Sequence, residues 1–531
     1  MTESVPHFDL VVVGGGINGA GIARDAAMRG LSVALFEKGD FSSGTSAWSS
    51  RLIHGGLRYL EYFEFPLVYE SLNERRRLQE IAGHLVSPIR VAIPLYRGGK
   101  RAPWLVRLGL SFYDLLSFRK KLPNHEVLGR RSALREEPGL NAEGLVGLAR
   151  YSDAQVQFAE RLVLENVLDA VAHGARLFNY SPVIEILETD GAVRGIAYRE
   201  PENDERRVVH AAAVVNAAGP WVDSVLDTAG AQENDLIGGT KGSHIIVSPF
   251  RGAPRDAVYA EAEADGRPFF ILPWNGLFLI GTTDIRYDGS LDAARISDPE
   301  VDYLLSETNR VFPGARLSRE SVHYAYAGVR PLPQQEEGPE SAITRKHQVI
   351  ENREIARHLF SVVGGKLTTF RSLAEEVVDR VVSAIGAEAG PVSTAAEPLP
   401  GAPEIDTARE RLESAGLLSG AGAARLLSIY GGRAHALLDG IEEGSLPDGT
   451  LGDDGRVLRA EVPFAFSSEL ARELEDVVFR RTMLGFDADQ GRRYYVEIAD
   501  LAAKHLGWDP AERGQALERL GRYADSFRIR G

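Results

Sequence analysis

The stretch FDLVVVGGGINGAGIARDAAMRGLSVALFEKGD, residues 8–40, decides the fold of this chain. It begins with a mostly apolar run at 8–13, of the kind that a buried parallel strand shows. Gly14, Gly16 and Gly19 follow in the spacing G-x-G-x-x-G, ahead of a helical pattern. The first glycine makes a tight turn, the second lets the backbone approach a pyrophosphate, and the third lets helix and strand pack closely. The amides at the start of the helix add donors for the phosphates, so the pattern predicts a dinucleotide site.

An acidic residue stands where such a site needs one. A second apolar run, residues 31–36, ends at Glu37, eighteen residues after Gly19. A carboxylate at this distance accepts hydrogen bonds from a ribose 2′-hydroxyl, which argues against a 2′-phosphate on the ligand. A glycine motif alone is weak, because a glycine-rich turn without a ligand reads the same way. The strand, the helix and the acid in register favour the nucleotide site.

Composition excludes several classes of protein. A chain of 531 residues predicts two or three domains, and 44% hydrophobic with 25% charged residues is ordinary for a soluble globular protein. The absence of cysteine excludes disulfides, iron–sulfur clusters, thiol nucleophiles and a cysteinyl link to a cofactor. The first residues lack the basic and apolar regions of a signal peptide, and no run of eighteen apolar residues predicts a spanning helix. The net charge of −15 disfavours nucleic-acid binding.

Further motifs resemble those of a known family. They are GTSAWSSRLIHGGLRYLEYFEFPLV at 44–68, KGSHIIV at 241–247, LIGTTDIRY at 279–287, YAGVRPL at 326–332, ITRKH at 343–347, VVGGKLTTFRSLAEE at 362–376 and EDVVFRRTMLGF at 475–486. In these motifs, and in their order and spacing, the chain resembles the FAD-dependent glycerol-3-phosphate dehydrogenases of the respiratory, quinone-reducing kind. The resemblance covers almost the whole chain. One departure is Ala47-Trp48, where the family often has serines.

The resemblance implies an α/β fold with three parts: a Rossmann-like FAD-binding domain, a mixed β-sheet substrate domain of the flavin amine oxidase type and a C-terminal all-α domain. We expect the FAD-binding domain at 1–75, 150–235 and 345–388, the substrate-binding and membrane-facing domain at 76–149 and 236–344, a linker at 389–404 and the helical domain at 405–531. Within the last domain the residue pattern predicts helices at 408–418 and 468–483, the second capped by Ser467 or Ser468.

The family resemblance also implies a non-covalently bound FAD and no metal. The implied cofactor contacts are Gly14, Gly16, Asn18, Gly19, Glu37, Lys38, Gly44, Thr45, Ser46, Ser50, Leu52, His54, Val183, Ala218, Gly219, Gly365, Lys366, Leu367 and Thr368. In this arrangement the pyrophosphate lies on the glycine turn and the ribose on Glu37. Residues 365–368 close over the polar edge of the flavin ring.

A flavin dehydrogenase that acts on a phosphorylated secondary alcohol needs cations for the phosphate and a group that takes the hydroxyl proton. Arginine offers bidentate contacts to phosphate, whereas lysine is a point charge. The substrate contacts implied by the resemblance are Arg58, Tyr59, His244, Arg330, Arg345 and Lys366. His54, Arg330 and Lys366 are the implied catalytic residues, and the identity of the base stays open among His54, His244 and Lys366.

Lysine usage adds a separate indication. Only eight of the 60 basic residues are lysine, and two of them, Lys241 and Lys366, stand among glycines and polar residues. A compact, rotatable ammonium differs from a planar guanidinium. The setting therefore favours a functional role for both lysines over a solvated surface position.

The segment 96–125 breaks the acidity of the chain. It places Arg97, Lys100 and Arg101 before an apolar stretch that contains Trp104, and Arg119, Lys120 and Lys121 after it. An apolar helix with cationic flanks suits the boundary between lipid headgroups and acyl chains. A core helix with solvated charges is the alternative. The segment favours docking on the inner face of the cytoplasmic membrane, and hence a cytoplasmic, peripherally membrane-associated protein.

The function implied by the resemblance is oxidation of sn-glycerol 3-phosphate to dihydroxyacetone phosphate, by hydride transfer from C2 to flavin N5. The electrons pass to a membrane quinone, and a homodimer is a further option. One alternative is a glycerol-3-phosphate oxidase that uses oxygen, although oxidase relatives carry an insertion for which residues 250–345 leave no room. A second is a flavin amine or amino-acid oxidoreductase, which the clustered cations disfavour. A third is a flavin-bound regulatory or membrane-binding protein without turnover.

Overall fold

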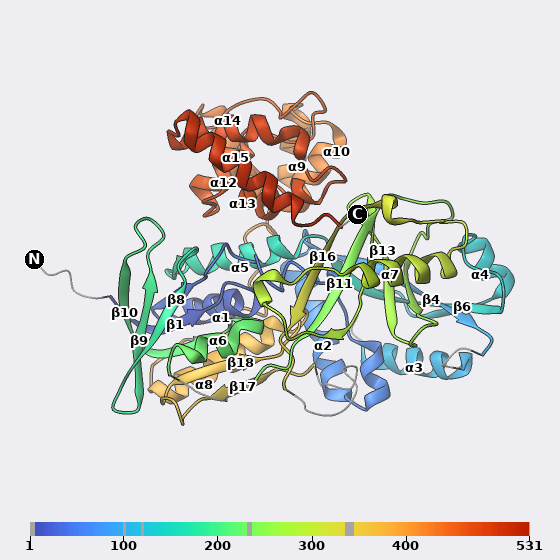
Figure 1. The fold of residues 1–531 in the computed structure, drawn as a ribbon, viewed down its shortest axis with the longest axis horizontal. Coiled ribbons are helices and arrows are strands. Elements are labelled where there is room, and N and C mark those ends of the chain that lie inside the picture. Colours follow the sequence, from blue (N-terminus) through green and yellow to red (C-terminus); the bar gives the residue numbers. More distant parts are fainter. Residues whose placement is uncertain (1–5, 99–101, 118–121, 231–235, 335–344, 530–531) are drawn as a thin grey trace, which may run out of the picture.

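The apolar run at 8–13 forms the centre of a parallel sheet in the computed structural model, which describes residues 6–98, 102–117, 122–230, 236–334 and 345–529 (Figure 1). In spatial order the strands of this first sheet are β17 (Gln348–Glu351), β18 (Leu359–Val363), β10 (Arg206–Asn216), β1 (His7–Val13), β2 (Val33–Phe36) and β7 (Arg176–Phe178). β1 pairs in parallel with β10 and β2. Beyond β10 the sheet continues as an antiparallel hairpin of β8 (Val183–Thr189) and β9 (Ala192–Arg199).

Both faces of the first sheet are buried. Leu10 and Val12 of β1 pack under the helices α1 (Ile17–Met28), α5 (Ala159–Ala172) and α8 (Phe370–Ile385). Val11 and Val13 point to the other face, which the β8–β9 hairpin and α6 (Val222–Asp227) cover. Successive side chains of a strand point to opposite faces, so a strand that is covered on both sides is apolar almost throughout.

The second sheet is mixed. Its strands in spatial order are β15 (Ile285–Arg286), β11 (Thr240–Val247), β14 (Leu277–Gly281), β13 (Pro268–Trp274), β12 (Ala257–Glu261), β4 (Val86–Tyr96), β6 (Leu145–Val156) and β3 (Leu52–Ile53), with β16 (Val322–Arg330) on β11 and β5 (Glu126–Gly129) on β6. Four helices accompany it: α2 (Phe65–Ile81), α3 (Pro103–Leu116), α4 (Arg130–Glu136) and α7 (Asp298–Val311). The pairing of β11 with β16 brings the KGSHIIV motif beside the YAGVRPL motif.

The C-terminal part of the chain is helical, as predicted, and forms a lobe beside α5 (Figure 1). Its helices are α9 (Ile405–Ala415), α10 (Gly420–Tyr430), α11 (Ala434–Glu442), α12 (Glu461–Ser468), α13 (Leu474–Asp476), α14 (Tyr495–Leu506) and α15 (Pro510–Asp525), with a π-helical turn η7 (Val477–Arg481) directly after α13. The end of the lobe returns to the second sheet, where the Ala325 amide donates to the Phe527 carbonyl at 2.8 Å.

The predicted helix at 468–483 is wrong in its start and in its cap. Ser468 ends α12, and the next helix begins at Leu474 with Glu473 as its N-cap. Between them Glu469 turns its carboxylate inward to Arg161 at 2.8 Å, and Leu470 has a left-handed φ of 59°. The amides of residues 472 and 473 then donate to the carboxylate of Asp476, which closes the start of α13. A buried ion pair thus interrupts a pattern that looks helical in sequence.

Residues 389–404, expected as a linker, contain no helix or strand. They are nevertheless packed against the rest of the protein, because Leu399 is fully buried and its amide donates to the carbonyl of Ile81, at the end of α2, at 2.8 Å. The Gly401 amide donates to the Glu165 carboxylate at 2.9 Å. The segment therefore holds the helical lobe close to the rest of the protein. The domain boundaries themselves stay a prediction.

Candidate functional site

The glycine turn between β1 and α1 is built for close approach. Gly14 has a φ of +108°, and a Cβ there would lie 2.7 Å from the Ala217 carbonyl oxygen. A Cβ at Gly19 would lie 1.9 Å from the Gly14 carbonyl oxygen, so both positions exclude any other residue. At Gly16 a Cβ would meet only Ser46 Oγ, at 3.1 Å, and would fill the mouth of the turn. No acidic side chain lies in the first turn of α1, which leaves the positive end of that helix suited to phosphate.

Glu37 lies beside this turn at the end of β2. Its carboxylate accepts from the amides of Gly15 at 2.6 Å and Gly39 at 2.8 Å. Burial raises the pKa of Glu37, and the two amide bonds act in the opposite direction. A carboxylate has about four lone-pair sites, so two remain for the hydroxyls of a ribose. The geometry fits the predicted role of this residue.

Segments that are far apart in sequence meet around the turn. Asn18 Nδ2 donates to the Gly364 carbonyl at 3.4 Å, and Thr45 Oγ1 donates to the Val329 carbonyl at 2.8 Å. The His54 amide donates to Thr368 Oγ1 at 3.1 Å. The loop after β2, the end of β16 and the stretch between β18 and α8 therefore form one wall. The predicted cofactor residues Ser46, Ser50, Leu52, Gly365 and Leu367 belong to these same segments.

The cations of the predicted substrate site cluster around one acid. Asp284 accepts from Arg330 Nη1 at 3.0 Å, and Arg345 Nη2 lies 3.5 Å from its other oxygen. Arg330 also donates to Thr282 Oγ1 at 3.0 Å. Burial lowers the pKa of Arg330, and so does the neighbouring charge of Arg345. Two guanidiniums thus share one carboxylate in a partly buried place, which is an environment that favours an added anion.

Lys366 adds a third basic group, from the stretch between β18 and α8. Its Nζ lies 3.8 Å from the centre of the Tyr59 ring and 3.4 Å from Ser71 Oγ. Burial lowers the pKa of Lys366 to about 7, with Arg345 acting in the same direction. The ammonium therefore titrates near neutrality, which suits both anion binding and proton transfer. The side chain of Arg58 lies outside the part of the structure that is described.

The two histidines of the site are neutral at pH 7. Burial lowers the pKa of His54 to about 4, and the charge of Lys366 adds to the effect. Burial likewise lowers the pKa of His244 to about 3, with contributions from Arg330 and Arg51. His244 Nε2 lies 2.9 Å from Ser50 Oγ, which ties the second sheet to the loop after β2.

Several buried polar atoms around this wall have no hydrogen-bond partner among the described residues, and three of them belong to predicted site residues. These three are Asn18 Oδ1, His244 Nδ1 and Arg345 Nη1. Buried polar atoms are normally paired, so their orphaned state at one place fits a polar ligand. Together with the open face of Gly16, they show that the residues present suit a bound dinucleotide and an anionic substrate.

Comparison with known proteins agrees with this geometry. Residues 9–380 match the family described as FAD dependent oxidoreductase, and residues 392–513 match the C-terminal domain of alpha-glycerophosphate oxidase. The chain belongs to the FAD-dependent oxidoreductase family. This confirms the predicted resemblance, the α/β fold with a mixed sheet and the helical C-terminal domain.

Individual members of the FAD-dependent oxidoreductase family are similar over nearly their full length. A glycerol-3-phosphate dehydrogenase from Synechocystis is 42% identical, covering 98% of this chain and 96% of that relative. A D-erythritol 1-phosphate dehydrogenase from Brucella abortus is 38% identical, covering 89% and 94%. The crystal structure of a Bacillus halodurans glycerol-3-phosphate dehydrogenase complexed with FAD covers 100% of this chain and 96% of its own, at 28% identity and a TM-score of 0.81.

Not every predicted residue of this FAD-dependent oxidoreductase lies in the cluster. Lys38 Nζ pairs with Asp292 at 2.6 Å and lies 4.1 Å above the Trp221 ring. Val183 is the first residue of β8. Ala218 and Gly219 follow β10 beside the glycine turn, where a Cβ on Gly14 would lie 2.9 Å from the Ala218 Cα. The Gly44 position faces Trp221, whose ring would lie 3.2 Å from a Cβ there.

Lys241 has a structural environment, contrary to the expectation from its glycine-rich setting. Its ammonium lies 2.8 Å from the Glu300 carboxylate and donates to the Arg295 carbonyl, also at 2.8 Å. Sequence reasoning also missed Asp284, which orders the two arginines. Its signal was available, because the polar triplet 282–284 follows an apolar strand within the LIGTTDIRY motif.

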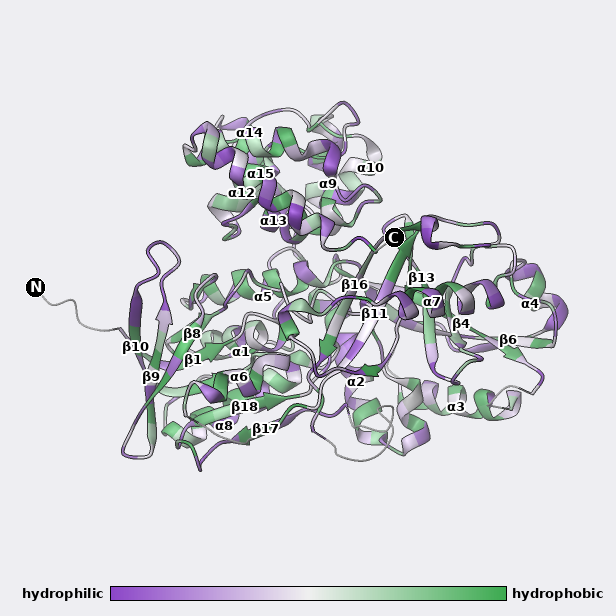
Figure 2. Ribbon diagram, viewed as in Figure 1, coloured by the Kyte–Doolittle hydropathy of each residue, from purple (hydrophilic) through white to green (hydrophobic). Residues whose placement is uncertain are grey.

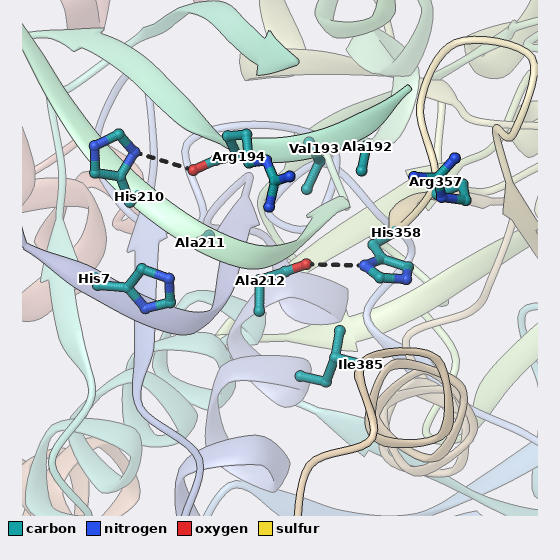
Figure 3. A pocket seen from close by; sticks show the side chains of 10 residues that line it. All are labelled: His7, Ala192, Val193, Arg194, His210, Ala211, Ala212, Arg357, His358 and Ile385. Carbon is teal, nitrogen blue, oxygen red and sulfur yellow. Dashed lines mark hydrogen bonds between the residues drawn. The ribbon is translucent and has the colours of Figure 1, made fainter. Parts of the chain in front are cut away.

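A surface hollow of about 400 Å³ lies elsewhere, along β9, β10 and the turn before β18 (Figure 3). Its lining residues are His7, Ala192, Val193, Arg194, His210, Ala211, Ala212, Arg357, His358 and Ile385. His210 and His358 each bond a backbone carbonyl through Nδ1, at 3.2 and 3.3 Å. None of the predicted site residues lines this hollow, so it is separate from the chemistry of the cluster.

Proposed function

We propose that this protein oxidises sn-glycerol 3-phosphate to dihydroxyacetone phosphate, with FAD as its cofactor and a membrane quinone as the final electron acceptor. The observation that carries the proposal is the partly buried cluster of Arg330, Arg345 and Lys366. Two guanidiniums and a lysine exceed what a substrate with one carboxylate requires. The two similar dehydrogenases that act on polyol phosphates support the same substrate class.

The residues that would hold FAD follow from the walls described above. The glycine turn and the start of α1 would bind the pyrophosphate, and Glu37 would bind the adenosine ribose. The stretch 364–368, which contacts Asn18 and His54, would lie against the flavin end. Bound FAD supplies a two-electron acceptor for the hydride that leaves C2 of the substrate. Its non-covalent attachment agrees with a chain that lacks cysteine.

In this proposal the phosphate binds to the guanidiniums. Arg345 Nη1 is buried without a partner among the described residues, and Arg330 is held in place by Asp284 and Thr282. Fixed donors lose little freedom when an anion binds, which favours orientation of the alcohol as well as affinity. Asp284 balances part of the charge until the dianionic phosphate arrives.

Lys366 is the best-suited proton acceptor for the substrate hydroxyl. A base works best when its pKa lies near the working pH, and the pKa of Lys366 is lowered to about 7. His54 and His244 are weaker bases, because burial lowers the pKa of His54 to about 4 and that of His244 to about 3. We assign proton transfer to Lys366 Nζ, and positioning within the site to the two imidazoles.

An exposed apolar surface supports docking on the membrane. Among the described residues, no helix is both long and apolar enough to cross a bilayer. On α3, however, Trp104, Leu108 and Leu115 are 68%, 59% and 65% exposed. Phe63, which is 77% exposed, extends this surface to the start of α2. There the ring of Phe65 packs edge-on against Phe112 of α3, with 5.4 Å between the ring centres. We call these residues the α3 patch.

The α3 patch lies at one edge of the molecule, where α3 carries hydrophobic residues along most of its length (Figure 2). Exposed apolar groups gathered in one place are typical of a surface that binds a membrane or a protein. An enzyme that reduces a lipid-soluble quinone has to reach its acceptor at the membrane. Of the flanking cations, Arg97 lies in the described part of the chain, whereas Lys100, Arg101, Arg119, Lys120 and Lys121 lie outside it. We therefore place the protein in the cytoplasm, bound peripherally to the membrane.

The test is an anaerobic visible spectrum of the purified protein before and after addition of sn-glycerol 3-phosphate. A bound flavin absorbs at about 450 nm. We expect this band to bleach with sn-glycerol 3-phosphate and to persist with glycerol and with sarcosine. Bleaching by the amine alone would contradict the proposal. A colourless protein that takes up no FAD would contradict the cofactor assignment itself. Reoxidation by a quinone analogue faster than by oxygen separates the dehydrogenase from the oxidase.

A larger polyol phosphate is a second candidate substrate, because the similar D-erythritol 1-phosphate dehydrogenase is 38% identical. Both substrates share the phosphate and a secondary alcohol. Measuring kcat/KM for the two compounds on one preparation decides between them, since the phosphate contacts are common and only the chain length differs.

A further inference from the structure

A buried aspartate links the cofactor turn to the C-terminal helical domain. Asp40 stands three residues after Glu37, in a loop of the first sheet. Arg481 donates to both of its oxygens, at 2.7 Å from Nη1 and 2.9 Å from Nη2. Arg480 donates to it from Nε at 2.7 Å. Both arginines belong to η7, more than 400 residues further along the chain.

The contact is almost fully buried. Asp40, Arg480 and Arg481 are 1%, 4% and 0% exposed. Burial alone would raise the pKa of Asp40, but the two guanidiniums outweigh it and lower the pKa to about 2. Asn179 Nδ2 also donates to the Asp40 carboxylate, at 3.1 Å. A buried charge that is bound on all sides is expensive to release, because its partners would remain buried and unpaired.

Asp40 is flanked by two contacts that shape the nucleotide turn. On one side the Gly39 amide donates to Glu37 at 2.8 Å. On the other side Phe41 packs on Gly15, where a Cβ would lie 2.8 Å from the Phe41 ring, and the Ser42 amide donates to the Gly15 carbonyl at 3.0 Å. A displacement of Asp40 therefore moves both the ribose-binding carboxylate and the glycine turn.

The η7 turn is itself held to the first sheet by a second contact. Tyr180 donates from its hydroxyl to Asp476 at 2.7 Å, and the Tyr180 amide donates to the Gly39 carbonyl at 2.8 Å. Arg480 also donates to Asp476. Two independent chains of contacts thus run from the helical domain to Gly39 and Asp40.

We propose that the C-terminal helical domain clamps the adenosine end of the FAD site through Asp40, Arg480 and Arg481, which act as positioning residues for Glu37 and the glycine turn. The proposal rests on the proposed FAD cofactor. It assigns the helical domain a role in cofactor affinity, in addition to any role in covering the substrate domain.

The test compares Asp40→Asn with Glu469→Gln in the full-length apoprotein. Glu469 is also buried and also joins the helical domain to the rest of the protein, through Arg161 of α5 at 2.8 Å. Its second partner, Arg433 at 2.7 Å, lies in the helical domain itself, and neither arginine belongs to the loop after β2. The probes are FAD and ADP, which carries only the adenosine and pyrophosphate. We expect D40N to lose about tenfold or more in affinity for both, by the same factor, while E469Q keeps both affinities.

Added FAD is expected to restore the turnover of D40N, because the defect lies in affinity. Arg481→Lys retains the charge without the two-pronged contact and serves as a milder variant, with a smaller loss for both probes. Unchanged affinities in folded D40N and R481K would overturn the clamp. An equal loss in E469Q at equal melting temperature would overturn it too, since any buried pair would then have the same effect. A wild-type protein that binds no FAD contradicts the proposed cofactor instead.

Discussion

Lys366 shows how burial alone prepares a residue for chemistry. Burial, which lowers the pKa of His54 to about 4, also lowers that of Lys366 to about 7. Desolvation disfavours the charged form of every base, so the group that starts with the highest pKa ends near neutrality. The histidines are consequently inert at pH 7, whereas the lysine exchanges its proton in the physiological range.

Replacement of Lys366 by methionine tests this assignment. We expect kcat/KM for glycerol 3-phosphate to fall by about 10²- to 10⁴-fold, the usual contribution of a positioned base. In the wild type kcat/KM should rise as the pH passes through about 7, since the neutral amine is the base, and this limb should vanish in K366M. A wild-type profile that falls through the same range would instead indicate that the ammonium serves the phosphate alone.

At the scale of an element, α3 differs from the other helices around the second sheet. It buries Leu110 and Tyr113 against the protein, and the Tyr113 hydroxyl donates to the Asp153 carboxylate at 3.0 Å. The opposite side presents Trp104, Leu108 and Leu115 to solvent. A helix that is apolar on both sides is suited to lie between a protein core and a second apolar phase.

The substitution Leu108→Glu is expected to release the protein from vesicles that contain anionic lipid. The charge would have to enter the acyl boundary, which costs more than the exposed leucine gains there. The matched control is Val496→Glu on α14, where the valine is 58% exposed but lies in the helical domain. Co-sedimentation with vesicles provides the measurement, and flavin bleaching by substrate verifies that each variant is folded. Equal sedimentation of L108E and wild type would refute the α3 patch.

At the scale of the whole molecule, buried ion pairs join the C-terminal helical domain to the rest of the protein. Arg161 of α5 reaches Glu469 at 2.8 Å with both side chains fully buried, beside the Asp40 cluster. Burial alone would raise the pKa of Glu469, but Arg161 and Arg433 lower it from an ordinary 4.5 to about 2. Such pairs add specificity to the contact between the parts, because each charge finds its partner only in one arrangement.

This pair makes the stability of the protein depend on acid. A carboxyl whose pKa is lower in the folded than in the unfolded state stabilises the folded state at every pH above its unfolded pKa. This stabilisation is lost as the pH falls through about 4.5 towards 2. Wild type and E469Q should thus differ in their free energy of unfolding by an amount that depends on pH. This difference should shrink by on the order of 3 kcal/mol between pH 6 and pH 2. Urea titrations at several pH values measure it, and a difference that stays constant would exclude the ion pair as its source.

Much of the candidate site follows from local sequence. The glycine turn and Glu37 belong to one strand–turn–helix–strand unit, so spacing alone predicts their geometry. Arg330, Lys366 and Asp284 stand in short motifs, whereas no local signal points to the contact that Asp40 and Arg481 make. Their roles depend on partners far away in the chain, and neither periodicity nor composition reports such partners.

The sequence by itself determined the parallel sheet with its nucleotide turn, the family and the helical nature of the C-terminal part, because apolar period, glycine spacing and motif order are properties of neighbouring residues. Only the tertiary structure decided that Lys241 is paired with Glu300, that α12 stops at Ser468, and that the helical domain reaches Asp40. Burial and the pairing of distant charges decide these points. Both arise only when the chain has folded, since they depend on which side chains exclude water from one another.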